Sequence, residues 1–132
     1  MAEAQSGLAQ AERAIGNLEA AAHHYANAVA LYRELGLRDR LAYALRHQAD
    51  VLREMGKVVE AEPLYREAES IYRPLGESAT LDLANTLRGL ALLNESGGKT
   101  SAAKALWQEA RELYSKCNVE AGVAECDQKL SR

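Results

Sequence analysis

Phenylalanine is absent from this sequence of 132 residues, and proline and cysteine occur only twice each. No apolar run approaches the roughly 20 residues that a transmembrane helix needs, so we expect no membrane span. Lysine and arginine form no cluster and the net charge is -3, which argues against nucleic acid as a partner, because its phosphates require concentrated positive charge. The N-terminal residues lack the basic and apolar segments of a secretory signal. These absences favour a soluble cytoplasmic protein with an ordinary hydrophobic core.

The residues that most often carry chemistry are few and scattered. Cys117 and Cys126 are nine apart, whereas zinc and redox motifs need closer pairs so that two thiolates converge. We interpret both as packing or surface thiols, with Cys117 closing a helix end. His23 and His24 are adjacent, which separates them by about 100° on a helix and prevents easy chelation of one ion. Since His24 takes a repeat position that elsewhere holds leucine, we expect a partly packed ring.

The glycine pair at 97–98, followed by lysine and threonine, is similar in composition to a phosphate-binding loop. It lacks the spaced first glycine and the preceding strand that arrange backbone N–H groups around a phosphate. We therefore expect a turn there. With no cluster of nucleophile, base or metal ligands, the sequence predicts no enzyme, no metal and no cofactor.

Internal repetition is the strongest feature of the sequence. A shift of 40 residues superposes Tyr25 on Tyr65, and a further shift of 42 superposes Tyr65 on Trp107. The same shifts align three glycines, three sets of alanines and three more tyrosines: Gly16, Gly56, Gly98; Ala9, Ala49, Ala91; Ala21, Ala61, Ala103; Ala28, Ala68, Ala110; Tyr32, Tyr72, Tyr114. We place the repeats at about 1–40, 41–80 and 81–122, within a single domain of residues 1–132.

Each repeat has the pattern of two helices. Leu41, Leu45 and Ala49 recur at helical spacing before Gly56 breaks the pattern, and the following helix carries its alanines and tyrosines on one face. Small alanines let helices approach closely and aromatic rings fill the gaps, so we interpret Tyr65 and its equivalents as core wedges. Alternating β-branched runs are absent. A helical hairpin cannot bury its apolar face alone, which predicts an all-α solenoid of stacked antiparallel helix pairs.

Several residues predict where helices begin and end. Pro63 is expected near a helix start, where a missing N–H costs least, while Pro74 and Gly76 end that helix. Ser78 or Thr80 is expected to cap the next one.

After residue 122 a tail follows, in which Val119, Val123, Cys126 and Leu130 share one helical face. It is either a capping helix at 123–132 or the first helix of a truncated fourth repeat. Both interpretations remain open.

The aligned positions resemble tetratricopeptide repeats. That family has a small residue within its first helix (Ala49), glycine at the turn (Gly56), alanine early in the second helix (Ala61), then an aromatic (Tyr65) and a further alanine (Ala68). The phrase EAEPLYREAESIY and the period of 40 to 42, longer than the usual ~34, resemble the kinesin-light-chain type. The first-helix aromatic of the family is missing, and repeat one is more polar, as in an N-terminal capping repeat.

The resemblance implies a right-handed superhelix that binds a protein or peptide without catalysis, in a concave groove lined by first helices. On the helix at 41–55 the stripe opposite the packing face is Tyr43, Arg46, Asp50 and Arg53; in repeat three it is Asn85, Arg88, Leu92 and Glu95, and in repeat one Glu3, Ser6, Gln10 and Arg13. We expect the residues of repeats two and three in this stripe to contact the partner.

Within this stripe, Arg46 and Arg88 occupy the same repeat position. We expect them to stack as a clamp for a carboxylate, although the peptide-carboxylate clamps of the family favour lysine and asparagine. The alternative is a solvated face in which Asp50 pairs with Arg46 and Arg53 at helical spacing.

Two other functions remain open at this stage. The solenoid ends could pair with another copy, giving a homo-oligomeric assembly module. The chain could also be a regulatory fragment of a larger multidomain protein.

Overall fold

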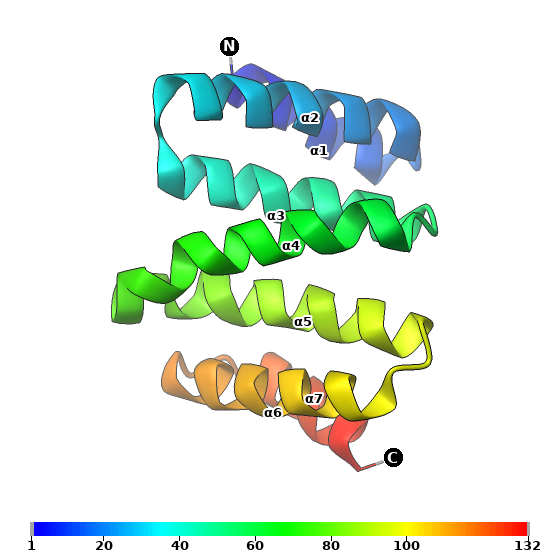
Figure 1. The fold of residues 1–132 in the computed structure, drawn as a ribbon, viewed down its shortest axis with the longest axis vertical. Coiled ribbons are helices and arrows are strands. Elements are labelled where there is room, and N and C mark those ends of the chain that lie inside the picture. The colour runs from blue at the N-terminus through cyan, green and yellow to red at the C-terminus, as the bar shows by residue number, and fades with distance from the viewer. Residues whose placement is uncertain (1, 132) are drawn as a thin grey trace. The chain divides into compact units, whose positions relative to one another are not determined.

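A computed structural model describes residues 2–131, which form seven α-helices, one 3₁₀ helix and no strand. Figure 1 shows them in chain order from blue to red. The helices are α1 (Ala2–Ala14), α2 (Leu18–Leu35), α3 (Arg38–Glu54), α4 (Val58–Tyr72), η1 (Arg73–Ala79), α5 (Thr80–Ser96), α6 (Thr100–Lys116) and α7 (Glu120–Leu130). The all-α fold and the seven expected helices are confirmed.

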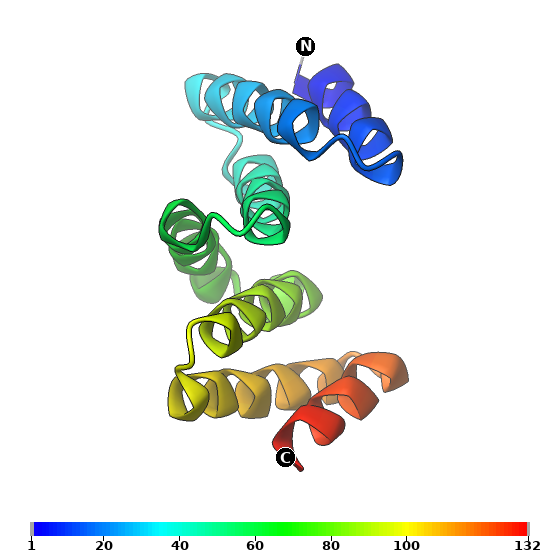
Figure 2. The same cartoon turned by 90° about the vertical axis from the view of Figure 1, so that its right-hand side faces the viewer.

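The chain divides into two compact units, residues 1–71 and 72–132. In the first unit, α1 packs on α2 and α2 packs on α3. Figure 2 looks along α3 and α4, which lie side by side as a further pair. In the second unit, α5 packs on α6 and α6 packs on α7. Consecutive helix pairs are thus the building block of both units, as the repeats predict.

The turns between paired helices repeat in geometry as well as in sequence. Gly16, Gly56 and Gly98 have φ of +84°, +80° and +73°, a region that only glycine enters without steric cost. Each donates its N–H to a carbonyl three residues back, at 3.0, 2.9 and 3.1 Å. The glycine pair at 97–98 is therefore a turn, as expected.

The turn from α6 to α7 repeats the turn from α2 to α3. Leu37 donates its N–H to the Tyr32 carbonyl at 3.1 Å, and Val119 donates to the Tyr114 carbonyl at 3.0 Å. At the left-handed position of the second turn stands Asn118, with φ of +59°, the residue type that tolerates this region best after glycine. These matching turns let α7 follow α6 with the same turn geometry by which α3 follows α2.

The aromatic residues at repeat positions are buried, as predicted. The set is Tyr25, Tyr32, Tyr65, Tyr72, Trp107 and Tyr114, each 0–4% exposed. Alanines of the two helices in each pair are buried with them, including Ala9, Ala49 and Ala91 on first helices. Tyr43 is the one tyrosine outside this set, and it is exposed.

Two expectations about helix ends were wrong. Pro63 lies inside α4, five residues after its first residue, so it omits a hydrogen bond that the helix would otherwise make. Neither Ser78 nor Thr80 caps α5: their hydroxyls donate to the carbonyls of Leu75 and Glu77, and Ala79 is the N-cap residue.

The last helix begins earlier than the tail at 123–132 suggested. It starts at Glu120, after an N-cap at Val119 that makes no side-chain capping bond. The left-handed Asn118 ends the preceding segment, so α7 can start at once.

Candidate functional site

We use the term first-helix surface of the first unit for the side of α1 and α3 that carries the aligned stripe residues. Side-chain bonds connect the two helices there. Arg13 on α1 makes a two-pronged ion pair with Glu54 on α3, at 3.0 and 2.8 Å. Arg40 pairs with Glu3, and the Gln10 amide donates to the Tyr43 hydroxyl at 3.4 Å. Forked arginine–carboxylate pairs hold geometry better than single bonds, so α1 and α3 are linked in a defined register.

Asp50 is the centre of this surface. The Arg46 guanidinium lies 3.1 Å from Oδ2, and the Arg53 guanidinium lies 3.6 Å from Oδ1. Both ion pairs expected at helical spacing are therefore present. The Tyr65 hydroxyl also donates to Oδ1. Asp50 is only 7% exposed, so it belongs to the interior of the helix pair rather than to an open face.

Rings and a guanidinium gather on the outer side of α3. Tyr43 is 37% exposed; its ring centroid lies 4.3 Å from that of His47, and the Arg46 guanidinium carbon lies 5.8 Å from the Tyr43 ring. The His47 ring stacks on Tyr25 at 5.5 Å. Such contacts restrict the rotamers of Tyr43 and leave one face of it open.

His47 is held in its neutral form. Burial, with Arg46 and Arg13 nearby, lowers the pKa of His47 to about 3. Arg46 donates to Nε2 at 3.1 Å, and an arginine cannot accept. The neutral ring therefore carries its proton on Nδ1.

A pocket opens between these helices. It has a volume of about 370 Å³ and is lined by Gln10, Arg13, Ala14, Tyr25 and His47. At this place the described part of the chain leaves three buried polar atoms without a hydrogen-bond partner: the Tyr25 hydroxyl, His47 Nδ1 and Arg46 Nε. Buried donors are nearly always satisfied in native proteins, so this group is unusual.

The second unit presents a corresponding surface on α5 and α7. Arg88 makes a forked pair with Glu125, at 2.6 and 3.0 Å. Glu95 accepts from the Trp107 indole at 2.8 Å and from Lys129 at 3.3 Å. Asn85 accepts from the Tyr114 hydroxyl at 2.7 Å, and Leu92 is half-buried. Polar groups of this surface thus bond within the unit.

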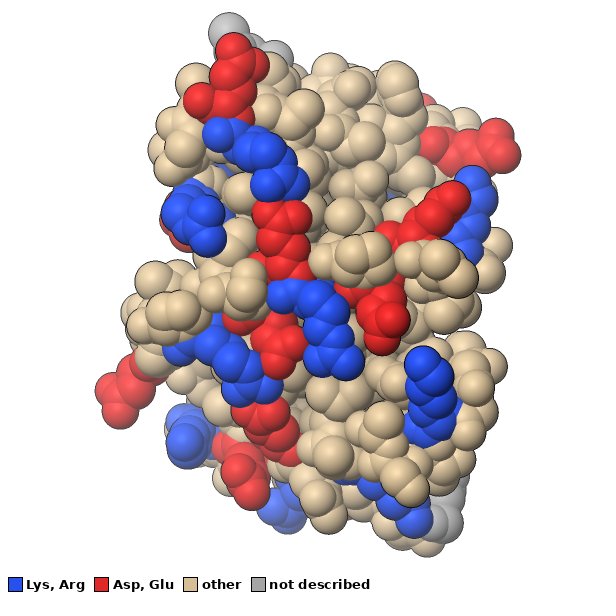
Figure 3. Space-filling model, viewed as in Figure 1, with Lys and Arg blue, Asp and Glu red and all other residues tan. Residues whose placement is uncertain are grey.

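Ion pairs outside the first helices also join successive repeats. Arg33 on α2 forks onto Glu67 on α4, at 2.7 and 3.1 Å. Within the other unit, Arg73 forks onto Glu109, at 2.6 and 2.9 Å. Figure 3 shows acidic and basic side chains next to one another over α2 and α4, with no large patch of one sign. Exposed pairs of this kind contribute ~0–1 kcal/mol each, and they fix register more than stability.

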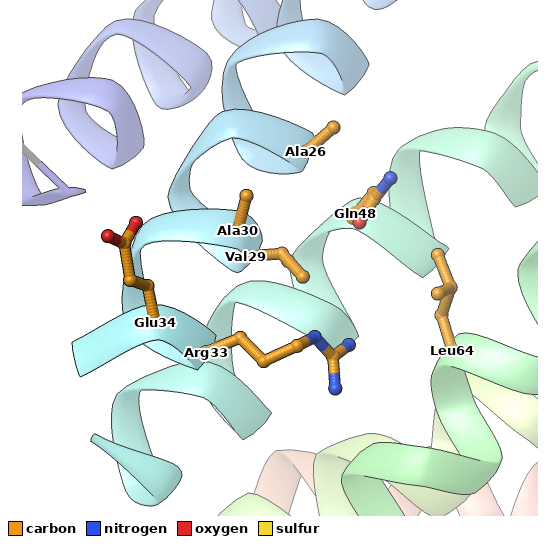
Figure 4. A pocket seen from close by; sticks show the side chains of 7 residues that line it. All are labelled: Ala26, Val29, Ala30, Arg33, Glu34, Gln48 and Leu64. Atoms are coloured by element: carbon orange, nitrogen blue, oxygen red, sulfur yellow. The ribbon is translucent and has the colours of Figure 1, made fainter. Parts of the chain in front are cut away.

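A shallow depression of about 540 Å³ lies between α2, α3 and α4. Figure 4 shows its lining: Ala26, Val29, Ala30, Arg33, Glu34, Gln48 and Leu64. Arg33 extends along it while Glu34 points away. The Arg33 guanidinium is bound to Glu67, so the positive charge in this depression is already paired.

The cysteines and histidines form no reactive cluster in residues 2–131. No group of three His, Cys, Asp or Glu residues there could hold a metal ion. Cys126 is fully buried, and burial raises the pKa of its thiol to about 11. His24 is half-buried and its Nδ1 lies 2.8 Å from the Gln5 amide oxygen, as expected of a partly packed ring. Across the same residues, none of the helices is both long and apolar enough to cross a membrane.

The sequence missed several residues of these surfaces. Tyr25, His47, Glu54, Glu125 and Lys129 were not among the expected contacts. His47 follows Tyr43 by four positions, which places both on one helix face, and that spacing is a usable signal. Glu125 aligns with Tyr43 and Asn85 once α7 is read as a first helix.

The family model described as tetratricopeptide repeat matches residues 1–73 and 40–116. The chain belongs to the tetratricopeptide-repeat family. Tetratricopeptide repeats generally mediate protein–protein interaction, and their fold is typically a non-catalytic scaffold.

Among solved structures, the chain resembles the crystal structure of BtubC (BKLC) from P. vanneervenii, with a TM-score of 0.77 and 19% sequence identity. The match covers 98% of this chain and 63% of that one, so the chain spans less than two thirds of its structural neighbour. At this identity the likeness concerns the fold. No curated protein matches the sequence.

Proposed function

We propose that this protein is a non-catalytic interaction module that binds a peptide or partner helix on the first helices of its repeats. Membership of the tetratricopeptide-repeat family supports protein binding as the general role. The first-helix residues Tyr43, Arg46 and Arg53 serve the first unit, where the buried Asp50 holds the two arginines, and Asn85, Arg88, Leu92 and Glu95 serve the second.

The observation that carries the proposal is the position of Tyr43. It is the only tyrosine placed on a first helix, and its exposed ring is held by His47 and Arg46. A partner that covers such a ring loses little side-chain entropy, because the ring is already ordered. Tyrosine and arginine are also the residues most enriched at energetic centres of interfaces.

Both arginines of the proposed site already have carboxylate partners within the chain. Arg46 is paired with Asp50 and Arg88 with Glu125. A carboxylate from a partner must compete with these internal carboxylates, so each arginine contributes less than an unpaired guanidinium. Loss of both side chains is still expected to weaken binding at least tenfold, since ~1.4 kcal/mol corresponds to that factor.

The test is site-directed photo-crosslinking, followed by affinity measurement. A photoreactive phenylalanine at position 43 should capture the partner in cells. The same group at position 59, an exposed valine on α4, is the matched control. With the partner identified, Tyr43→Ala and Arg46→Ala should each lower affinity, whereas Arg66→Ala on α4 should not. Capture from position 59 alone would place binding on second helices and contradict the proposal.

Self-association is the competing outcome of the same experiment. A crosslink from position 43 to a second copy of the chain would identify a homo-oligomeric module. Light scattering across a concentration series then distinguishes the two, because a partner-binding module stays monomeric on its own.

A further inference from the structure

We propose that the pocket lined by Gln10, Arg13, Ala14, Tyr25 and His47 receives one carboxylate of the partner, which takes the place that an internal carboxylate holds in repeats two and three. This inference rests on the proposed function and names the chemical group that the first unit recognises. Comparison of the three repeats leads to it.

In repeat two, the wedge aromatic is bound to an acid of the first helix. Tyr65 donates its hydroxyl proton to Asp50, and Arg53 donates to the same hydroxyl at 3.1 Å. The phenol thus sits between a carboxylate and a guanidinium, with both of its hydrogen-bonding roles filled.

In repeat three the polar hydrogen of the wedge aromatic is also bound by an acid, but the residues differ. Trp107 replaces the tyrosine, and its indole N–H donates to Glu95 at 2.8 Å. Glu95 aligns with Arg53 rather than with Asp50. In both repeats a first-helix carboxylate accepts a hydrogen bond from the wedge aromatic, although the acid stands at a different aligned position in each.

Repeat one has no such acid. Its residues at the two positions are Gln10 and Arg13. Tyr25 is 0% exposed and its hydroxyl has no hydrogen-bond partner in the described chain. Burial raises the pKa of Tyr25, so the phenol keeps its proton and remains a donor without an acceptor.

The surroundings of Tyr25 favour an anion. His47 Nδ1 and Arg46 Nε are further donors without partners. Arg13 and Arg46, which pair with Glu54 and Asp50, both act electrostatically on Tyr25, so two guanidiniums border the site. Charge-assisted bonds in a partly desolvated pocket are the strong ones.

Access requires one small movement. Tyr25 lines the pocket, but its hydroxyl is buried from solvent. Gln10 lines the pocket and is exposed. Among residues 2–131 its side chain bonds only to Tyr43, at 3.4 Å, which is at the weak end for hydrogen bonds. We assign Gln10 as the side chain that a carboxylate displaces.

The probe for this pocket is the blocked tripeptide N-acetyl-Ala-Glu-Ala-amide, followed by nuclear magnetic resonance at constant ionic strength. Amide shifts are expected around Gln10, Tyr25 and His47, and not with the glutamine analogue. A third tripeptide, N-acetyl-Ala-Ala-Ala with a free C-terminus, distinguishes a terminal carboxylate from a side-chain carboxylate. Equal shifts from the glutamate and glutamine peptides would overturn the inference.

Two variants test the assignment of the donors. Tyr25→Phe removes the orphaned hydroxyl, and Gln10→Asp supplies the acid that repeat two has. Both should weaken tripeptide binding by about fivefold or more without lowering the melting temperature. The control Tyr65→Phe should lower the melting temperature and leave tripeptide binding intact. Unchanged binding in both variants would show that the carboxylate does not replace the missing acid.

The result separates this inference from the proposed function. If the tripeptide produces no shifts while Tyr43→Ala still weakens binding of the captured partner, only the carboxylate assignment fails. If Tyr43→Ala has no effect but the tripeptide binds as expected, the pocket stands and the proposed partner contact through Tyr43 fails.

Discussion

Buried polar side chains at repeat positions determine both stability and specificity at the scale of single residues. Tyr65 illustrates the first role, because its ring fills the space between helices and its hydroxyl satisfies Asp50 and Arg53. Tyr25 has the same ring and lacks the polar partners. The tyrosine hydroxyl thus has its hydrogen-bond partners in repeat two and lacks them in the described part of repeat one.

Truncation of Tyr65 should be among the most damaging single changes. Tyr65→Ala removes a fully buried ring and should cost ~3–5 kcal/mol in the free energy of unfolding. Tyr65→Phe keeps the ring but leaves Asp50 and Arg53 less satisfied, at a cost of ~1–3 kcal/mol. Urea denaturation measures both values. A loss below ~1 kcal/mol for the alanine variant would mean that the ring is not part of the core.

His47 should make stability depend on pH. Its pKa is lowered to about 3 in the folded protein, whereas the unfolded chain titrates near 6.5. Between these values the unfolded state binds more protons, so stability falls as pH decreases from about 6.5 toward 3, with a slope of at most ~1.4 kcal/mol per pH unit. Above about pH 7 the contribution is constant.

The matched test compares His47→Gln with His23→Gln. His47→Gln should flatten the stability profile between about pH 6.5 and 4, while His23→Gln, which changes an exposed ring, should not. Denaturant midpoints across that range give the profiles. A slope that persists in His47→Gln would assign the pH dependence to carboxylates such as Glu109, whose pKa is lowered by Arg73.

At the scale of elements, helix approach is set by small residues at specific contacts. A Cβ atom at Gly122 on α7 would lie 2.5 Å from Cγ of Tyr114 on α6. Side chains essentially never approach so closely, and a ring in a packed helix face cannot retreat cheaply. Gly122 therefore lets α7 lie directly on the Tyr114 ring.

Gly122→Ala should loosen α7. Overpacking of this kind costs ~1–3 kcal/mol, and hydrogen exchange of the α7 amides should accelerate. The control is Gly7→Ala, a second helical glycine with open space around its Cβ position, which should stabilise α1 by ~0.5–1 kcal/mol. Equal effects of the two substitutions would mean that helix propensity, and not contact with Tyr114, governs position 122.

At the scale of the whole molecule, stability should be distributed over neighbouring repeats. In repeat proteins the free energy is approximately a sum of repeat terms and nearest-neighbour interface terms. The division at residues 71 and 72 agrees with this, because each unit has its own packed helix pairs.

The corresponding prediction concerns where a core substitution is felt. Tyr65→Ala should reduce hydrogen-exchange protection most in α3 and α4, and least in α6 and α7. Trp107→Ala, the equivalent change in the second unit, should give the reverse pattern. Uniform loss of protection along the chain in either variant would show that the protein unfolds as one cooperative body.

Repetition and helical spacing were sufficient to predict the helix pairs, the glycine turns and the buried aromatic set. Those features depend on local chemistry: positive φ at Gly56 and the periodic face that includes Tyr65 are properties of short segments. Helix ends were less predictable, because Ser78 and Thr80 had other carbonyls to bond.

Only the tertiary structure decided which polar residues of the first helices face a neighbour. Helical periodicity gives the angle of Asp50 around α3 but not what lies across from it, and a tyrosine from α4 buries it. Long arginine side chains can reach several acids, so Arg88 pairs with Glu125 on another helix while Arg46 pairs within its own. The sequence shows that repeat one has Gln10 and Arg13, and no acid, at the two aligned positions. Only the contacts in repeats two and three show that an acid at one of these positions binds the wedge aromatic.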